Sequence, residues 1–124
     1  MEVVHSNRVR VPAVPLSNAV RSGNHIFVSG TTPYTADRKI AVGDFEAQMR
    51  QVMENIKALL ADAGSSLDKV VKTNVILVRK SDFPKMNEIY RSYFKEGAYP
   101  ARTTMICGLA NDAFLLEIEC VTEA

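Results

Sequence analysis

The sequence has no apolar stretch long enough to cross a bilayer, so no membrane partner is expected. Its first residues, MEVVHSNRVRVP, lack the basic segment followed by an apolar run that is typical of a signal peptide. We therefore expect a cytoplasmic protein. The net charge is only +1, without the basic excess of dedicated nucleic-acid-binding proteins, so a nucleic-acid partner is not expected.

Residues that bind metals or cofactors are also scarce. The two cysteines, Cys107 and Cys120, both lie in apolar strand-like segments and are predicted to be reduced and buried rather than joined in a disulfide. His5 and His25 are far apart and have no metal-ligand spacing. The sequence contains no glycine-rich phosphate loop and no serine in a nucleophile elbow. We therefore expect neither a metal nor a cofactor.

The overall composition is that of an ordinary globular protein, with 124 residues, 47% of them hydrophobic and 23% charged. This length predicts one domain over residues 1–124 with a single hydrophobic core. Near its start, the short strand patterns 18–21 and 25–29 flank the turn residues Ser22-Gly23-Asn24, which predicts a hairpin. A polar loop is expected from Pro33 to Ile40.

Two amphipathic helices are predicted from apolar residues that recur every three or four positions. The first begins after Asp44, which can cap it, and ends near Gly64, with Met49 and Met53 facing the core. The second covers residues 83–94 and has Ser81 or Asp82 as its candidate cap. Between the helices, the β-branched segment 70–79 predicts a buried strand.

Two further strands, 103–107 and 115–121, are expected to form a closing hairpin through Gly108 and Asn111-Asp112. The order of hairpin, helix, strand, helix and hairpin predicts an α+β fold, with helices on one face of a mostly antiparallel or mixed sheet. The other face of the sheet would stay exposed unless a second subunit covers it.

Arg102 is the most informative polar residue. It lies two positions after Pro100, at the start of an apolar strand, and arginine is rarely buried without a partner. Its guanidinium can bind a carboxylate through two parallel hydrogen bonds. The alternative is a salt bridge to Glu117 or Glu119 across the closing hairpin.

The last strand, FLLEIECV, places two carboxylates on one face. Phe114, Leu116, Ile118 and Cys120 alternate with Leu115, Glu117, Glu119 and Val121. Glu117 and Glu119 either lie on a solvated face or line a partly dry pocket, where burial raises the pKa of a carboxylate toward neutrality. Asn87 in the second helix is either an exposed side chain or a donor aimed at a ligand, and Ser29 and Thr104 are further candidates.

Several segments together resemble the Rid family, also called YjgF/YER057c/UK114. PARTTMICGLANDAFLLEIE is similar to its carboxyl-terminal signature, in which Pro-Ala-Arg precedes a strand that is followed by Glu-Ile-Glu. HIFVSGTTP, QVMENIKALLADAGSSLDKVVKTNVIL and DFPKMNEIYRSYF resemble its second strand, its long helix with the central strand, and its second helix. The resemblance extends over nearly the whole chain.

The resemblance implies a chorismate-mutase-like α+β fold and a homotrimer with barrel-like packing of three sheets, with three equivalent clefts between subunits. It implies that Arg102 holds a substrate carboxylate, that Glu117 lies by the attacking water, and that the backbone carbonyl of Thr104 orients this water. Ser29, Gly30 and Asn87 would line the pocket. Each of these residues occupies a position that matches a motif of the family's deaminases.

The implied activity is that of a 2-iminobutanoate/2-iminopropanoate deaminase-like hydrolase acting on C=N bonds. It would hydrolyse small enamine or imine carboxylic acids to ammonia and a 2-keto acid. The sequence departs from the family's deaminases at Leu16, which stands where they usually carry a tyrosine, and at Thr103-Thr104, which replaces a Ser-Cys or similar pair. The substrate pocket is thus expected to be more apolar. A non-catalytic carboxylate-binding module and the endoribonuclease attributed to some relatives remain as alternatives.

Overall fold

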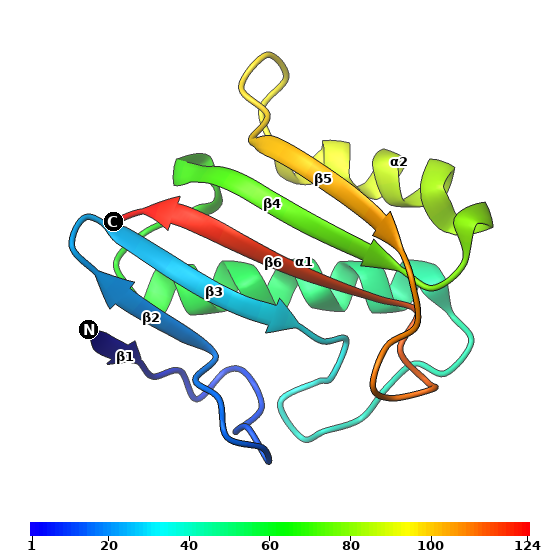
Figure 1. Cartoon of the computed structure of the whole chain (residues 1–124), viewed down its shortest axis with the longest axis horizontal. Coiled ribbons are helices and arrows are strands. Elements are labelled where there is room, and N and C mark those ends of the chain that lie inside the picture. Colours follow the sequence, from blue (N-terminus) through cyan, green and yellow to red (C-terminus); the bar gives the residue numbers. More distant parts are fainter.

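The fold is described from a computed structural model that covers residues 1–124. Six strands and two α-helices follow one another along the chain (Figure 1). Their bounds are β1 Glu2–Val4, β2 Ala19–Ser22, β3 His25–Thr31, α1 Phe45–Asp62, β4 Val70–Leu77, α2 Phe83–Tyr93, β5 Ala101–Ile106 and β6 Leu116–Glu123. Short 3₁₀ turns at Leu67–Lys69 and Lys80–Asp82 precede β4 and α2.

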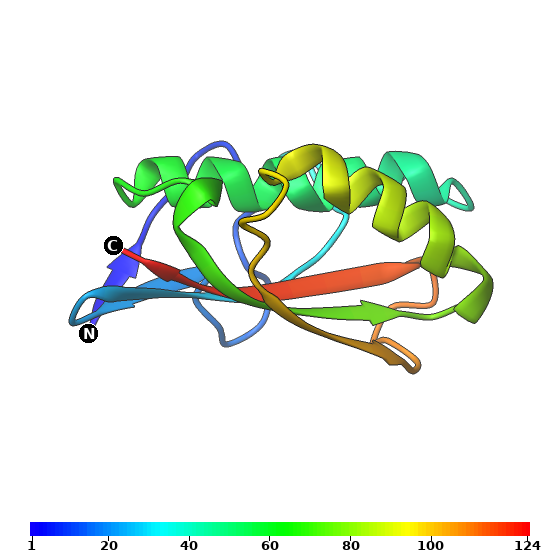
Figure 2. The ribbon, with the colours of Figure 1, turned by 90° about the horizontal axis from the view of Figure 1, so that it is seen from above.

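The strands form one sheet in the order β1-β2-β3-β6-β4-β5. Every neighbouring pair is antiparallel except β4 and β5, which run parallel. Both helices lie against the same face of this sheet, as Figure 2 shows from above. The predicted α+β class and the mixed sheet with its helices on one face are therefore confirmed.

The predicted closing hairpin is wrong. β5 and β6 do not pair, because β4 lies between them, with Val75 opposite both Thr104 of β5 and Ile118 of β6. The chain leaves β4, passes through α2 and returns as β5, and a helical crossover of this kind gives a parallel pair. Turn residues between two strands show only that the chain bends there, so the sequence did not reveal the intervening strand. The short strand β1 was not predicted either.

The core lies between the sheet and α1, and the predicted caps of this helix are confirmed. The Asp44 side chain accepts a hydrogen bond of 3.0 Å from the backbone N–H of Ala47, and Gly64 after the helix has a positive φ of 80°. Met49 and Met53 are fully buried, as predicted. They pack in a cluster whose other fully buried members include Ile26, Ile56, Leu60, Leu77, Met86, Ile89, Leu116 and Ile118.

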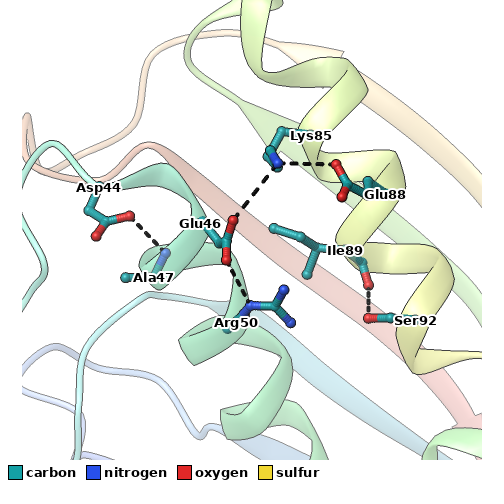
Figure 3. A network of polar contacts seen from close by, with 8 residues as sticks. All are labelled: Asp44, Glu46, Ala47, Arg50, Lys85, Glu88, Ile89 and Ser92. Carbon is teal, nitrogen blue, oxygen red and sulfur yellow. Dashed lines mark hydrogen bonds and ion pairs between the residues drawn. The ribbon is translucent and has the colours of Figure 1, made fainter.

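A surface network of charged side chains joins the first turns of α1 and α2 (Figure 3). Glu46 of α1 contacts Arg50 at 3.4 Å and Lys85 of α2 at 3.8 Å, and Lys85 also contacts Glu88 at 3.1 Å. Exposed ion pairs of this kind contribute roughly 0–1 kcal/mol each to the free energy of unfolding. The buried side chains of α2, such as Met86 and Ile89, therefore hold this helix in place. Asp82 makes no capping bond to α2 and pairs instead with Arg79 at 2.8 Å.

The face of the sheet away from the helices carries exposed apolar side chains. Phe27 is 45% exposed on β3, and Met105 is 46% exposed on the edge strand β5. Cys107 just beyond β5 is also exposed, which contradicts its predicted burial, because the edge of the sheet leaves this position uncovered. Cys120 is buried as predicted, and burial raises the pKa of its thiol to about 12. Neither helix is long and apolar enough to span a membrane.

Candidate functional site

Arg102 lies on the helix side of the sheet. It pairs with the buried Thr73 of β4, and its side chain extends toward α2. The guanidinium carbon is 5.0 Å from the centre of the Tyr90 ring and 5.9 Å from that of Phe83, and Nη1 is 3.8 Å from the sulfur of Met86. Cation–π contacts at these distances hold the guanidinium in place. None of its N–H donors is bonded to a carboxylate of the chain.

The guanidinium of Arg102 has no acidic partner, so the alternative of a salt bridge to Glu117 or Glu119 is wrong. It opens into a groove of about 360 Å³ between α2 and the start of β5. We call this groove the arginine half-site, and it is lined by Asn87, Tyr90, Arg91, Tyr99, Pro100 and Arg102. The structure thus brings Asn87 and Arg102 together. Thr104 follows on the same face of β5, because alternate residues of a strand share a face.

Glu117 lies on the opposite face. Its neighbours Leu116 and Ile118 are buried beneath the helices, so its side chain extends from the open face of β6. The carboxylate lies over Gly30, where a β-carbon would be 3.5 Å from Oε1, and the pairing of β3 with β6 is irregular between Val28 and Thr31. Burial raises the pKa of Glu117 above its usual range, and Glu119 adds to this effect while Arg10 opposes it.

The segment before β2 is attached to β3 beside Gly30. The Ser29 hydroxyl donates a hydrogen bond of 2.6 Å to the Ser17 carbonyl, and the Ser29 N–H donates one of 2.9 Å to the Asn18 carbonyl. Leu16 in this segment is 42% exposed and lines a groove of about 790 Å³ together with Arg10 and Ser17. We call the surface formed by Arg10, Leu16, Ser29, Gly30 and Glu117 the glutamate half-site.

A single chain does not bring the two half-sites together. β4 separates β5 from β6, so Arg102 and Glu117 belong to strands about 10 Å apart. They also extend from opposite faces of the sheet, one toward α2 and the other away from it. Of the seven residues singled out from the sequence, Arg102, Asn87 and Thr104 lie on the arginine side, whereas Glu117, Gly30, Ser29 and Leu16 lie on the glutamate side.

Sequence reasoning missed several residues of these half-sites. The helical spacing of Tyr90 predicts only packing on the apolar face of its helix, yet its ring also supports Arg102, and its hydroxyl lies 2.8 Å from the Thr73 hydroxyl. Arg10 carries no comparable signal in the sequence. It is one of two arginines that alternate with valines in the segment SNRVRVP, and this pattern does not indicate a site.

Comparisons with known proteins agree with the fold. The model of the family described as endoribonuclease L-PSP matches residues 7–124. A RutC family protein of Pyrococcus abyssi is 40% identical over 97% of this chain and 94% of its own length, and the protein MMF1, mitochondrial, of Saccharomyces cerevisiae is 36% identical over 86% and 72%.

Among solved structures, a protein of unknown function of the conserved Rid family from Yersinia pestis, YyfA, superposes with a TM-score of 0.93 at 32% identity. The match covers 99% of this chain and 98% of that one. This agreement over nearly the full length confirms the chorismate-mutase-like fold that the resemblance implied. The chain therefore belongs to the endoribonuclease L-PSP family, which is the Rid or YjgF/YER057c/UK114 family predicted from its sequence motifs.

Proposed function

We propose that this protein is a hydrolytic deaminase of small enamine or imine carboxylic acids. The observation that carries the proposal is the Arg102 guanidinium, which is oriented by the Tyr90 ring, has no acidic partner and lines a groove large enough for a small organic acid. A guanidinium in this state is suited to bind a carboxylate, because its paired N–H donors match the two oxygens of the ligand.

The proposed site forms between two copies of the chain in a homotrimer. One copy contributes the arginine half-site and its neighbour contributes the glutamate half-site, which a single chain cannot bring together. The exposed apolar side chains of the open face, such as Phe27 and Met105, favour covering of this face by further copies. A closed three-fold ring uses one heterologous contact three times and so creates three identical sites.

In the proposed reaction, Arg102 holds the substrate carboxylate, and the C=N carbon lies beside Glu117 of the neighbouring copy. A water oriented by Glu117 and by the Thr104 backbone carbonyl attacks this carbon, and a C–O bond forms as the C=N π bond becomes N–H. Glu117 accepts a proton from the water and returns it to nitrogen. Glu117 then moves the hydroxyl proton of the carbinolamine to the same nitrogen, and the C–N bond breaks as the C=O bond forms, giving ammonia and a 2-keto acid.

The raised pKa of Glu117 suits this proton transfer. A general acid or base is most effective when its pKa lies near the working pH, and such catalysis contributes about 10²–10⁴-fold. Positioning of the water and substrate contributes several further kcal/mol. Leu16, where the family's deaminases usually carry a tyrosine, adds an apolar contact at the glutamate half-site and no phenol donor.

The test is hydrolysis of imino acids generated in situ by an amino-acid oxidase, measured as the increase in the rate of 2-keto acid release. Arg102→Ala should lower kcat/KM by about 10²-fold or more, because hydrogen bonds to a charged group contribute roughly 1.5–3 kcal/mol each. Arg50→Ala is the matched control, since this exposed arginine contacts Glu46 on the surface of α1 and lines neither half-site. An unchanged kcat/KM in Arg102→Ala would contradict the assignment of Arg102 to the substrate-binding site.

Two other results would assign a different function. Binding of small 2-keto acids that depends on Arg102, with no acceleration of hydrolysis by the wild-type protein, would identify a carboxylate-binding module. RNA cleavage that is lost in Glu117→Gln would favour the ribonuclease in the family model's description. The net charge of +1 gives little attraction for the phosphate backbone, so we expect no such cleavage.

A further inference from the structure

Arg10 is held firmly beside the glutamate half-site. Its Nε–H donates a hydrogen bond of 3.3 Å to the Thr32 hydroxyl, and its backbone carbonyl accepts one of 3.0 Å from the Asn18 side chain. The guanidinium carbon lies 5.5 Å from the centre of the Tyr34 ring. Three independent contacts therefore fix both ends of this residue.

One donor atom of Arg10 is left unused. Nη1 is buried and has no hydrogen-bond acceptor, and no carboxylate lies within salt-bridge distance of the guanidinium. A buried donor without an acceptor costs about 1–3 kcal/mol, and more when the group is charged. The neighbouring cation Arg38, which lies 5.3 Å from the same Tyr34 ring, adds to the unfavourable charge. An anion bound beside the guanidinium would offset the unfavourable charge, and a small rotation of the side chain would expose Nη1 to it.

The position of Arg10 links this unused donor to the proposed substrate. Arg10 lines a small cavity together with Ser29 and Gly30, and it also lines the larger groove that contains Leu16. Burial lowers the pKa of Arg10, and the negative charge of Glu117 opposes this effect. Arg10 therefore belongs to the glutamate half-site, whereas Arg102 belongs to the arginine half-site that another copy supplies in the proposed trimer.

The charges of the completed site indicate which substrate fits. Arg102, Arg91 and Arg10 with ionised Glu117 together leave two positive charges in excess. A protonated imine with a single carboxylate is neutral overall and leaves this excess in place. A protonated imine with two carboxylates carries one net negative charge and reduces it. Glu119 does not change the comparison, because it is exposed and accepts a hydrogen bond of 2.7 Å from Asn74.

We propose that Arg10 binds a second carboxylate on the substrate side chain, so that the preferred substrates are imino or enamino dicarboxylic acids. This inference rests on the proposed function for its reaction. The substrate would extend from Arg102, through the C=N carbon beside Glu117, to Arg10. The apolar Leu16 would contact the methylene groups between the two carboxylates.

The experiment compares imines generated in situ from glutamate and aspartate with imines generated from methionine and leucine. The wild-type protein should have a higher kcat/KM for the dicarboxylic imines. In Arg10→Met, which keeps the length of the side chain but removes its charge, the ratio of dicarboxylic to monocarboxylic kcat/KM should fall about 10–100-fold. Arg38→Met is the matched control, because it removes a charge from the same Tyr34 ring at an exposed position.

A binding measurement separates this inference from the proposed function. 2-Oxoglutarate should bind the wild-type protein more tightly than 2-oxobutanoate, and the difference should disappear in Arg10→Met. This result without any turnover would overturn the deaminase while supporting the role of Arg10. Turnover with equal preference for both substrate classes, or the same loss of preference in Arg38→Met, would overturn the role of Arg10.

Discussion

At the scale of single residues, the informative features of this molecule are charged groups without the partners that burial normally requires. Arg102 is supported by aromatic rings rather than by a carboxylate, and Arg10 has a buried donor with no acceptor. Glu117 is partly buried over Gly30 with a raised pKa. The arrangements of Arg10 and Glu117 cost free energy in the unliganded protein, and clusters of such groups are typical of functional sites.

Glu117→Gln should stabilise the protein at neutral pH. Burial raises the pKa of Glu117 in the folded state, so the folded protein binds the proton more tightly than the unfolded chain. The free energy of unfolding therefore falls as the pH rises from the usual carboxyl range through the raised pKa. The glutamine variant avoids this loss, so its Tm should exceed that of the wild type at pH 7.

The comparison at low pH is the internal control of this measurement. The Tm difference should shrink toward pH 4, where the wild-type carboxyl group is protonated. Glu119→Gln should give no comparable gain at pH 7, because Glu119 is exposed on the same face of β6. A glutamine variant with a Tm below that of the wild type at pH 7 would show that ionised Glu117 stabilises the fold, contrary to its raised pKa.

At the scale of elements, α1 and α2 show how local sequence signals compare with tertiary contacts. The start of α1 is set by Asp44, whose side chain caps the helix as the sequence predicts. The start of α2 is different, since Asp82 pairs with Arg79 and leaves the cap position without a side-chain bond. The buried residues Met86, Ile89 and Tyr90 hold α2 against the sheet and so place Asn87 beside Arg102.

Asp44→Ala should lower the free energy of unfolding by about 1 kcal/mol, because it removes the acceptor for the Ala47 N–H in the first turn of α1. Urea unfolding at a fixed protein concentration measures this change. Asp68→Ala is the control, since this exposed carboxylate caps no helix, and its effect should stay within about 0.5 kcal/mol. Equal losses in the two variants would argue against the cap.

At the scale of the whole molecule, the chain carries two half-sites that it cannot join. They extend from opposite faces of one sheet, with β4 between their strands. The proposed trimer resolves this separation, and every site then depends on an ordered pair of copies. The cytoplasmic location expected from the sequence stays a prediction, because a relative from yeast is named as mitochondrial.

Mixing two inactive variants should restore activity. In trimers reassembled from equal amounts of Arg102→Ala and Glu117→Gln, roughly a quarter of the interfaces would combine an intact arginine half-site with an intact glutamate half-site. We therefore expect about a quarter of the wild-type imine hydrolysis rate after joint refolding. A mixture of Arg102→Ala with the double variant should stay inactive. Mass spectrometry would show whether mixed trimers form. If they form and activity does not return, the reaction does not depend on a site shared by two copies.

The sequence by itself determined the α+β class, both helices, the alternation of Leu116, Ile118 and Cys120 with Glu117 and Glu119, and membership of the family. These features are local, because helical and strand periodicity and capping residues depend on neighbours within a few positions. Arg102 and Asn87 could also be singled out from the sequence, and the structure places them in one groove.

Only the tertiary structure decided how β5 and β6 are arranged and which groups lack partners. Turn residues do not encode strand order, so the insertion of β4 between these strands, and with it the separation of Arg102 from Glu117, depended on the long-range packing of α2. The unused donor of Arg10 is likewise invisible in the sequence, because the absence of a partner depends on every residue that folds around it.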